Sequence, residues 1–237
     1  MKVIVTGDSH TADLFLGQKL LEEESPAPLA ADVVIRPLGG GHILPTPFFV
    51  DRGDHAEITA PQFRPQFARL PLDGVENHGT IYGICAPLHT ARVWRHADWR
   101  RFAPIGRAAN ETPISPGMLR RVILNDQKYV LALIDVFVRS GTRAFAIEAP
   151  RPFRHHPALK ILRPDVVLTV DRSYRDIMRA ELDDRSIPIV SIPAKCLDED
   201  GFTLEEYGRR HDPHHGNERF GRVMMLEVNK FLATMPG

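Results

Sequence analysis

Short apolar runs rich in β-branched residues alternate along the chain with segments in which apolar residues recur every three or four positions. The first pattern is typical of buried strands and the second of amphipathic helices. Strands are predicted at residues 3–6, 31–35, 80–86, 143–149, 166–170 and 187–192, and helices at residues 11–24, 126–139, 173–182 and 217–232. This alternation predicts an α/β fold, a three-layer α/β/α sandwich of the flavodoxin-like type with a mainly parallel sheet.

Residues 44–74 interrupt the pattern. They show no sustained period, and five prolines within them exclude a regular helix or a central strand. Four phenylalanines indicate that the segment nevertheless packs against something: Phe48, Phe49, Phe63 and Phe67. We interpret it as an irregular insertion within a single domain that spans residues 1–237, because one domain is the simpler expectation at this length.

The charge balance limits the class of partner. The chain has 30 basic and 30 acidic residues, so no net field would draw it to nucleic acid or to an anionic membrane. A small-molecule or carbohydrate partner is expected instead, with no nucleic acid and no membrane. Cys85 and Cys196 are far apart and lack a C-x-x-C spacing, which predicts reduced, buried thiols rather than a disulfide or a zinc ribbon.

The beginning of the chain reads as a strand. It has neither the charged start nor the small-residue cleavage site of a signal peptide. No apolar run approaches the roughly 20 residues of a membrane-spanning helix. The sequence therefore predicts a cytoplasmic location.

The loop after the first predicted strand reads Gly7-Asp8-Ser9-His10. In a parallel sheet, ligands bind beyond the carboxyl ends of the strands. A glycine there permits a sharp turn, and a serine at the start of the helix presents its hydroxyl and its N–H group to a ligand. The alternative is that Ser9 or Asp8 only caps the helix.

The loop before the last predicted helix contains Asp212 and His215. A nucleophilic serine needs a base to take its proton, and the base needs a carboxylate to orient it. Asp212 and His215 could supply both groups. The alternative is a polar loop with solvated histidines and with Asn217 as a helix cap.

Taken together, the two loops resemble those of the SGNH/GDSL hydrolases, which open with a G-D-S block and close with a D-x-x-H block. The resemblance covers nearly the whole chain in strand order. It implies the fold of that family, with Ser9 as nucleophile, His215 as general base and Asp212 as its orienting partner. It also implies a serine esterase that needs no cofactor or metal and acts on a small acyl ester, such as an acyl group on a carbohydrate.

Two further blocks of the family concern the oxyanion hole. Gly40, in the glycine run after the second strand, matches the glycine whose N–H group helps to form this hole. The family's third block, G-x-N-D, is absent after the third strand, where His89 is the candidate for the missing donor. Asn125-Asp126 resembles the end of that block, but no glycine precedes it.

Arginines could contact a polar or anionic group of the substrate. The candidates are Arg92 and Arg151, with Arg154 nearby, although arginines at a surface are mostly only solvated. Trp94 and Trp99 could stack on a sugar, or could be partly buried anchors.

Three other functions remain open. The same residues would make an O-acyltransferase if a sugar hydroxyl replaced water. The cluster His211-Asp212-x-His214-His215 would suit a metal-dependent hydrolase, although adjacent ligands rarely converge on one ion. The altered third block would suit a module that binds a glycan or a partner without catalysis. The sequence predicts neither the acyl group nor the oligomeric state.

Overall fold

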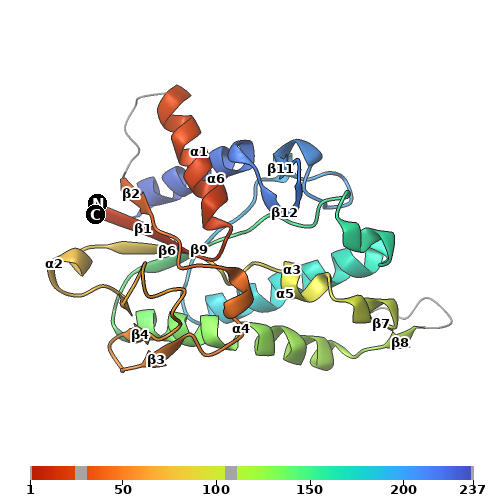
Figure 1. Cartoon of the computed structure of the whole chain (residues 1–237), viewed down its shortest axis with the longest axis horizontal. Helices are drawn as coiled ribbons and strands as arrows, with labels where there is room; N and C mark the ends of the chain where they lie inside the picture. The colour runs from red at the N-terminus through yellow and green to blue at the C-terminus, as the bar shows by residue number, and fades with distance from the viewer. Residues whose placement is uncertain (1, 25–30, 105–110, 236–237) are drawn as a thin grey trace.

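A five-stranded parallel sheet forms the centre of the fold, in the order β10-β9-β6-β1-β2 (Figure 1). The computed structural model describes residues 2–24, 31–104 and 111–235. The strands are β1 (Lys2–Gly7), β2 (Asp32–Ile35), β6 (Ile81–Cys85), β9 (Ala144–Ile147) and β10 (Ile189–Val190). Every neighbouring pair in this sheet is parallel, which confirms the predicted sheet.

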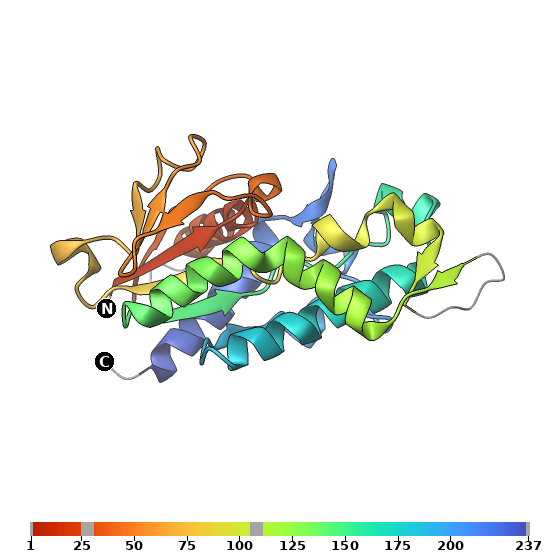
Figure 2. The same cartoon turned by 90° about the horizontal axis from the view of Figure 1, so that it is seen from below.

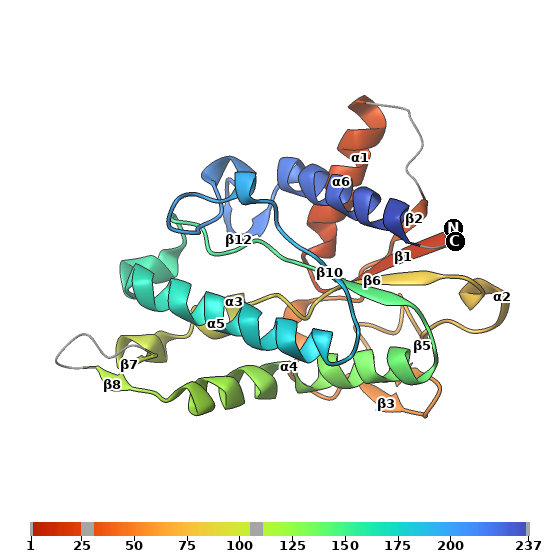
Figure 3. The ribbon, with the colours of Figure 1, turned by 180° about the vertical axis from the view of Figure 1, so that it is seen from behind.

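Two helices cover each face of the sheet. Helices α1 (Thr11–Glu24) and α6 (Glu218–Thr234) lie on one face, and α4 (Pro116–Arg139) and α5 (Pro164–Asp183) lie on the other (Figures 1 and 3). Figure 2 shows α4 and α5 side by side. The predicted three-layer sandwich is therefore confirmed.

The core follows from the alternation of side chains along each strand. Val3 and Val5 of β1 point into the apolar layer beneath α1 and α6, whereas Ile4 points into the layer beneath α4 and α5. Strand β9 divides in the same way, with Phe145 in the first layer and Ala146 in the second. Both faces of the sheet are thus buried, as expected of parallel strands.

Helices α1 and α6 touch through two glycines. A Cβ atom on Gly17 would lie 1.9 Å from the carbonyl carbon of Gly221, and one on Gly221 would lie 1.7 Å from the carbonyl oxygen of Asp13. No side chain fits in either place. The contact brings the helix that follows Ser9 against the helix that follows His215.

One predicted strand is wrong. Residues 166–170 belong to α5, which begins at Pro164 and also contains the helix predicted at 173–182. Its buried apolar and aromatic side chains recur at helical spacing: Val166, Val167, Val170, Tyr174, Met178 and Leu182. A short apolar run does not by itself distinguish a buried strand from a buried helix face, and Pro164 at the first helical position was the missed signal.

Helix α4 begins well before the predicted residue 126. The hydroxyl of Ser115 accepts a hydrogen bond from the N–H group of Met118 at 3.2 Å, and Pro116 opens the helix. These are the usual marks of a helix start. The first half of α4 escaped prediction because several of its apolar side chains, including Met118 and Val122, are exposed.

The segment 44–74 is more regular than predicted. It contains a small antiparallel sheet of β3 (Phe49–Asp51), β4 (Ala56–Ile58) and β5 (Arg69–Leu70), and α2 (Gly74–Asn77) follows. Three-residue strands fit between the prolines. Phe48, Phe63 and Phe67 are fully or almost fully buried and join the layer beneath α4 and α5, which confirms that the segment packs on the body of the protein.

Shorter elements complete the carboxyl edge of the sheet. They are η1 (Gly41–Ile43), α3 (Ala91–Trp94), η2 (Ala97–Arg100), β7 (Phe102–Ala103), β8 (Thr112–Pro113), η3 (Pro157–Lys160), η4 (Ala194–Cys196), η5 (Glu205–Tyr207), β11 (Gly208–Arg209) and β12 (Asp212–Gly216). The loop predicted before the last helix is therefore partly a strand, since β12 pairs with β11.

Two other predictions concern cysteines and membranes. Cys85 and Cys196 are free and buried, as predicted. Among the helices of the described ranges, none has the length and apolar character needed to cross a bilayer.

Candidate active site

Ser9 lies in the sharp turn between β1 and α1. Gly7, which precedes this turn, has a φ of +144°, and a Cβ atom there would lie 2.3 Å from the carbonyl oxygen of Cys85 on β6. Only glycine fits both the angle and the space. The hydroxyl of Thr11 donates a hydrogen bond to the carbonyl of Asp8 at 2.6 Å. The turn is thereby fixed with Ser9 at the carboxyl edge of the sheet.

The structure brings Ser9, His215 and Asp212 into one line of hydrogen bonds. The Ser9 Oγ atom lies 2.8 Å from Nε2 of His215, and Nδ1 of the same ring lies 2.6 Å from Oδ2 of Asp212. His215 and Asp212 lie on β12, near the opposite end of the sequence from Ser9. The arrangement can pass a proton from the hydroxyl to the imidazole while the carboxylate holds the ring.

The carboxylate of Asp212 is fixed by more than the imidazole. Its Oδ1 atom accepts from the N–H groups of His214 at 3.2 Å and His215 at 3.3 Å. Partial burial opposes ionisation, but these N–H groups and the nearby imidazole outweigh it and lower the pKa of Asp212 below its usual value. Asp212 is therefore a carboxylate at neutral pH.

Asp13 of α1 ties the helix that follows Ser9 to the hairpin of β11 and β12. One oxygen accepts from Nη2 of Arg209 at 2.8 Å, and the other accepts from the N–H group of Gly216 at 2.8 Å. Burial raises the pKa of Asp13 to about 7 despite the charge of Arg209. Because Gly216 directly follows His215, this tether positions the catalytic candidate from its backbone.

Two more imidazoles pack behind the serine. The ring of His10 lies 4.1 Å from that of His89 and 4.7 Å from that of His215, between ring centres. His10 pairs with Asp13, and Nδ1 of His89 pairs with Asp8. Burial is the main reason that the pKa values of His10 and His89 fall well below the usual value, so both rings are neutral at pH 7.

The three candidate donors of an oxyanion hole are the N–H groups of Ser9 and Gly40 and the imidazole of His89. In the part of the chain that the structure describes, the N–H groups of Ser9 and Gly40 have no hydrogen-bond partner. The Nε2 atom of His89 is buried and also without a partner there. The Nε2 atom can donate a hydrogen bond only in the tautomer in which Nδ1 is an acceptor. Nη1 of Arg92 lies 3.3 Å from Nδ1 and can only donate, which favours this tautomer. Burial raises the pKa of Asp8, which favours a proton on that carboxyl group.

The three arginines predicted to contact the substrate lie in different surroundings. Arg92 forms two hydrogen bonds to the carboxylate of Asp126, at 3.1 and 3.0 Å, and its side chain is only 9% exposed. Arg154 pairs with two aspartates at the surface. Arg151 is half-buried, and its Nε atom has no partner among the residues described. Arg92 and Arg154 are therefore engaged within the protein.

Trp94 and two further histidines, His156 and His214, form a wall beside His215. Trp94 and Trp99 are buried, and the ring of Trp94 packs edge-on against that of His156 at 4.6 Å. The ring of His214 lies 6.3 Å from that of His156 and 4.3 Å from that of His215. Burial, followed by the charge each neighbouring histidine would carry, lowers the pKa of both His156 and His214 to about 4. The wall is uncharged at neutral pH.

Potential metal ligands occur in two groups. Asp8, His10 and His89 bring one ligand atom each within 4.8 Å of one another, and Asp212, His214 and His215 do the same. Within each group a carboxylate already pairs with an imidazole. Both groups are thus explained as hydrogen-bonded pairs, and the second coincides with the proposed proton relay.

Sequence reasoning missed His10, Asp13 and Arg209. His10 stands beside the serine in the G-D-S-H run, which was a usable signal. Asp13 and Arg209 are separated by almost the whole chain, and only the contact of α1 with the β11–β12 hairpin brings them together.

Comparison with known proteins was made by sequence and by structure. No family model matches the sequence, and a search of curated proteins finds no match. Solved structures match nearly the whole chain. A protein assigned to the acylhydrolases from Bacteroides fragilis has 13% identity and a TM-score of 0.51, over 98% of this chain and 86% of its own. A GDSL-like lipase from Bacteroides thetaiotaomicron has 12% identity and a TM-score of 0.50, over 98% and 87% respectively.

A third solved structure, assigned as an SGNH hydrolase from Slackia heliotrinireducens, has 13% identity and a TM-score of 0.50, over 97% of both chains. The chain has the SGNH/GDSL hydrolase fold. At these identities the likeness establishes the SGNH/GDSL fold alone, because one fold supports many reactions. The chemistry of the site rests on its own geometry.

Proposed function

We propose that this chain is a serine-dependent ester hydrolase with Ser9, His215 and Asp212 as its catalytic triad. One observation carries the proposal: the hydroxyl of Ser9, the imidazole of His215 and the carboxylate of Asp212 form consecutive contacts of 2.8 and 2.6 Å. Helix capping, the alternative role for Ser9, would not require an imidazole at its hydroxyl.

The proposed reaction has two steps. The Ser9 oxygen attacks the ester carbonyl while His215 takes the hydroxyl proton, and the same imidazolium then protonates the departing alkoxide as the acyl-enzyme forms. In the second step, water attacks the acyl-enzyme, gives a proton to His215, and releases the acid while the proton returns to Ser9. Asp212 stabilises the imidazolium in both steps.

The negative charge that develops on the carbonyl oxygen needs donors. We assign this role to the N–H groups of Ser9 and Gly40, which lack internal partners among the described residues. His89 is the third donor, through Nε2, in the tautomer in which its Nδ1 accepts from a protonated Asp8, with Nη1 of Arg92 nearby. It replaces the side-chain amide that the family's third block normally supplies.

The substrate class within this proposal is a small acyl ester, with an acylated carbohydrate as one form. The uncharged wall of His156 and His214 beside the triad suits a neutral alcohol portion. O-acyl transfer is the second candidate, because a sugar hydroxyl could take the place of water with no change in the residues used. A metal-dependent reaction is the third, supported by the grouping of Asp212, His214 and His215.

Turnover of p-nitrophenyl acetate, followed both by the absorbance of p-nitrophenolate and by an assay of released acetate, tests the proposal. We expect one acetate for each p-nitrophenol released, at a rate unaffected by EDTA. With glycerol added, a shortfall of acetate and the appearance of glycerol acetate would identify transfer instead. Loss of activity in EDTA, restored by a divalent cation, would contradict the serine mechanism.

A further inference from the structure

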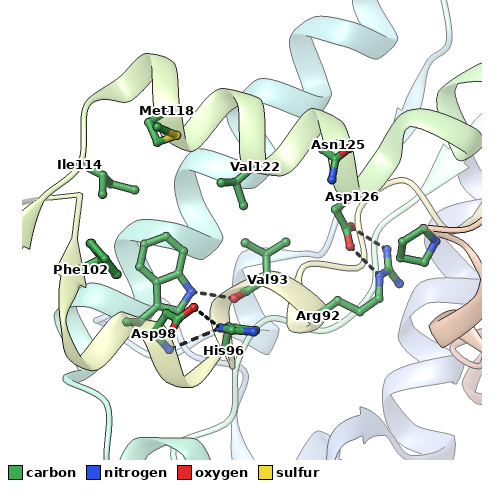
Figure 4. Close-up of a pocket in the computed structure, with 12 residues that line it drawn as sticks. Arg92, Val93, His96, Asp98, Phe102, Ile114, Met118, Val122, Asn125 and Asp126 are labelled. Carbon is green, nitrogen blue, oxygen red and sulfur yellow. Dashed lines mark hydrogen bonds and ion pairs between the residues drawn. The ribbon is translucent and has the colours of Figure 1, made fainter.

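The guanidinium of Arg92 lies between two carboxyl groups. On one side its Nε and Nη2 atoms donate to Oδ1 and Oδ2 of Asp126, at 3.1 and 3.0 Å, as the paired dashed lines in Figure 4 show. On the other side its Nη1 atom lies 3.9 Å from Oδ2 of Asp8 and 3.3 Å from Nδ1 of His89. A single cation therefore faces two potential counter-charges, and one of them belongs to the residue before Ser9.

Asp126 is built as the charged member of this set. Besides the two bonds from Arg92, its Oδ2 atom accepts from the hydroxyl of Tyr174 at 3.0 Å and from Nε2 of Gln127 at 3.1 Å. Four hydrogen-bond donors to one carboxyl group suit its ionised form. The two-pronged contact also fixes the guanidinium plane, which leaves Nη1 aimed at His89.

The charge of Asp8 decides which nitrogen of His89 carries the proton. Asp8 is fully buried, and its Oδ2 atom pairs with Nδ1 of His89 through one hydrogen bond. An ionised Asp8 would require the proton on Nδ1, and Nε2 would then present a lone pair. A protonated Asp8 donates to Nδ1 instead, so that Nε2 carries the N–H group and can donate.

Charge balance favours the protonated form of Asp8. Arg92 is always positively charged, and the ionised Asp126 already supplies its counter-charge within a largely buried pair, 9% and 12% exposed. Burial raises the pKa of Asp8, although the charges of its neighbours oppose the rise. Burial, and then the charge of Arg92, hold the pKa of His89 well below its usual value, so the imidazole does not become a cation. A proton on Nδ1 would also face the donor Nη1.

We propose that Asp126 is a positioning residue that, through Arg92, holds His89 in the tautomer that presents its Nε2–H group to the oxyanion. This inference rests on the proposed function, in which His89 is an oxyanion donor, and adds to it the residue that keeps the donor in its working form. Asp126 acts by clamping and neutralising Arg92, not by contact with the reacting atoms.

Asp126→Asn tests the proposal because it keeps the shape of the side chain and removes its charge. The freed charge of Arg92 should then ionise Asp8, and the proton of His89 should move to Nδ1. We expect kcat for p-nitrophenyl acetate to fall about 10²-fold, as for the loss of one oxyanion donor, with little change in KM. Asp135→Asn is the control: it breaks an ion pair of α4 with Arg185, 2.7 Å long, and should leave kcat unchanged.

A second substitution separates positioning from packing. Arg92→Gln, added to Asp126→Asn, removes the cation that the lost carboxylate had neutralised. Asp8 should regain its proton, and kcat should recover most of the loss. If Asp126 served only to pack this region, the second substitution would lower kcat further, and that result would overturn the proposal.

The tautomer can be observed without substrate. ¹⁵N NMR of histidine-labelled protein, with the His89 signals assigned by their absence in His89→Gln, shows which ring nitrogen is protonated. We expect Nε2 in the wild type, Nδ1 in Asp126→Asn, and Nε2 again in the double variant. A wild-type protein with the proton on Nδ1 would overturn the proposal even if Asp126→Asn failed to fold.

Failure of the proposed function would look different. If the tautomer changes as expected but the wild type hydrolyses no ester, the hydrolysis is rejected and the control of His89 by Asp126 remains. If the wild type hydrolyses esters and His89 keeps its proton on Nε2 in Asp126→Asn, the hydrolysis remains and the role of Asp126 is overturned.

Discussion

Ser9→Ala is expected to lower kcat/KM for p-nitrophenyl esters by roughly 10⁴-fold or more, because the nucleophile is removed while the oxyanion donors remain. The residual rate should still exceed that of the uncatalysed reaction, because those donors and substrate binding remain. Steady-state assays with purified wild-type and variant protein measure the ratio. The hydroxyl of Ser9 contributes little packing, so the Tm should stay close to that of the wild type.

Ser173→Ala provides the control for this experiment. Ser173 is a partly buried serine on α5, outside the site, and its replacement should leave both activity and Tm unchanged. A Ser9→Ala variant that retains more than a tenth of wild-type activity would reject Ser9 as the nucleophile.

Gly221→Ala is expected to destabilise the protein by about 3 kcal/mol or more. Its new Cβ atom would lie 1.7 Å from the carbonyl oxygen of Asp13, which is backbone and cannot rotate away. Overpacking of this kind typically costs about 1–3 kcal/mol, and more where backbone must move. Urea denaturation measures the change. Since α1 follows Ser9 and α6 follows His215, separating the two helices should also lower kcat/KM.

Gly117→Ala is the matched control for Gly221→Ala. Gly117 is also a helical glycine, but the nearest atom to a Cβ there is 3.9 Å away. Alanine has the higher helix propensity, so this variant should be as stable as the wild type or up to about 1 kcal/mol more stable. Equal urea midpoints for Gly221→Ala and the wild type would show that the two helices are not held at the separation described.

Much of the fold could be predicted because both faces of the sheet are buried. Strands such as β1 and β6 are continuous apolar runs, and α1 is bounded as the periodicity indicated. The pattern failed where burial no longer distinguishes a helix from a strand. Residues 166–170 form such a case, since both structures would place that run against the sheet.

In the candidate site, too, some residues could be predicted from the sequence and others could not. Ser9, Asp212 and His215 carry a recognisable local spacing, so sequence alone brought them forward as a set. The tether from Asp13 to Arg209 and Gly216 depends on contacts between residues 196 and 203 positions apart, which no local pattern encodes. The engagement of Arg92 with Asp126 likewise follows only from the packing of α3 near α4.

Labelling with a fluorophosphonate, followed by peptide mapping, tests the proton relay most directly. The reagent forms a stable adduct only with a serine whose hydroxyl is activated by a neighbouring base. The account predicts one adduct, on the peptide that contains Ser9, and its loss in His215→Gln. A wild-type protein that stays unlabelled, or a His215→Gln variant labelled at Ser9 at the wild-type rate, would contradict it.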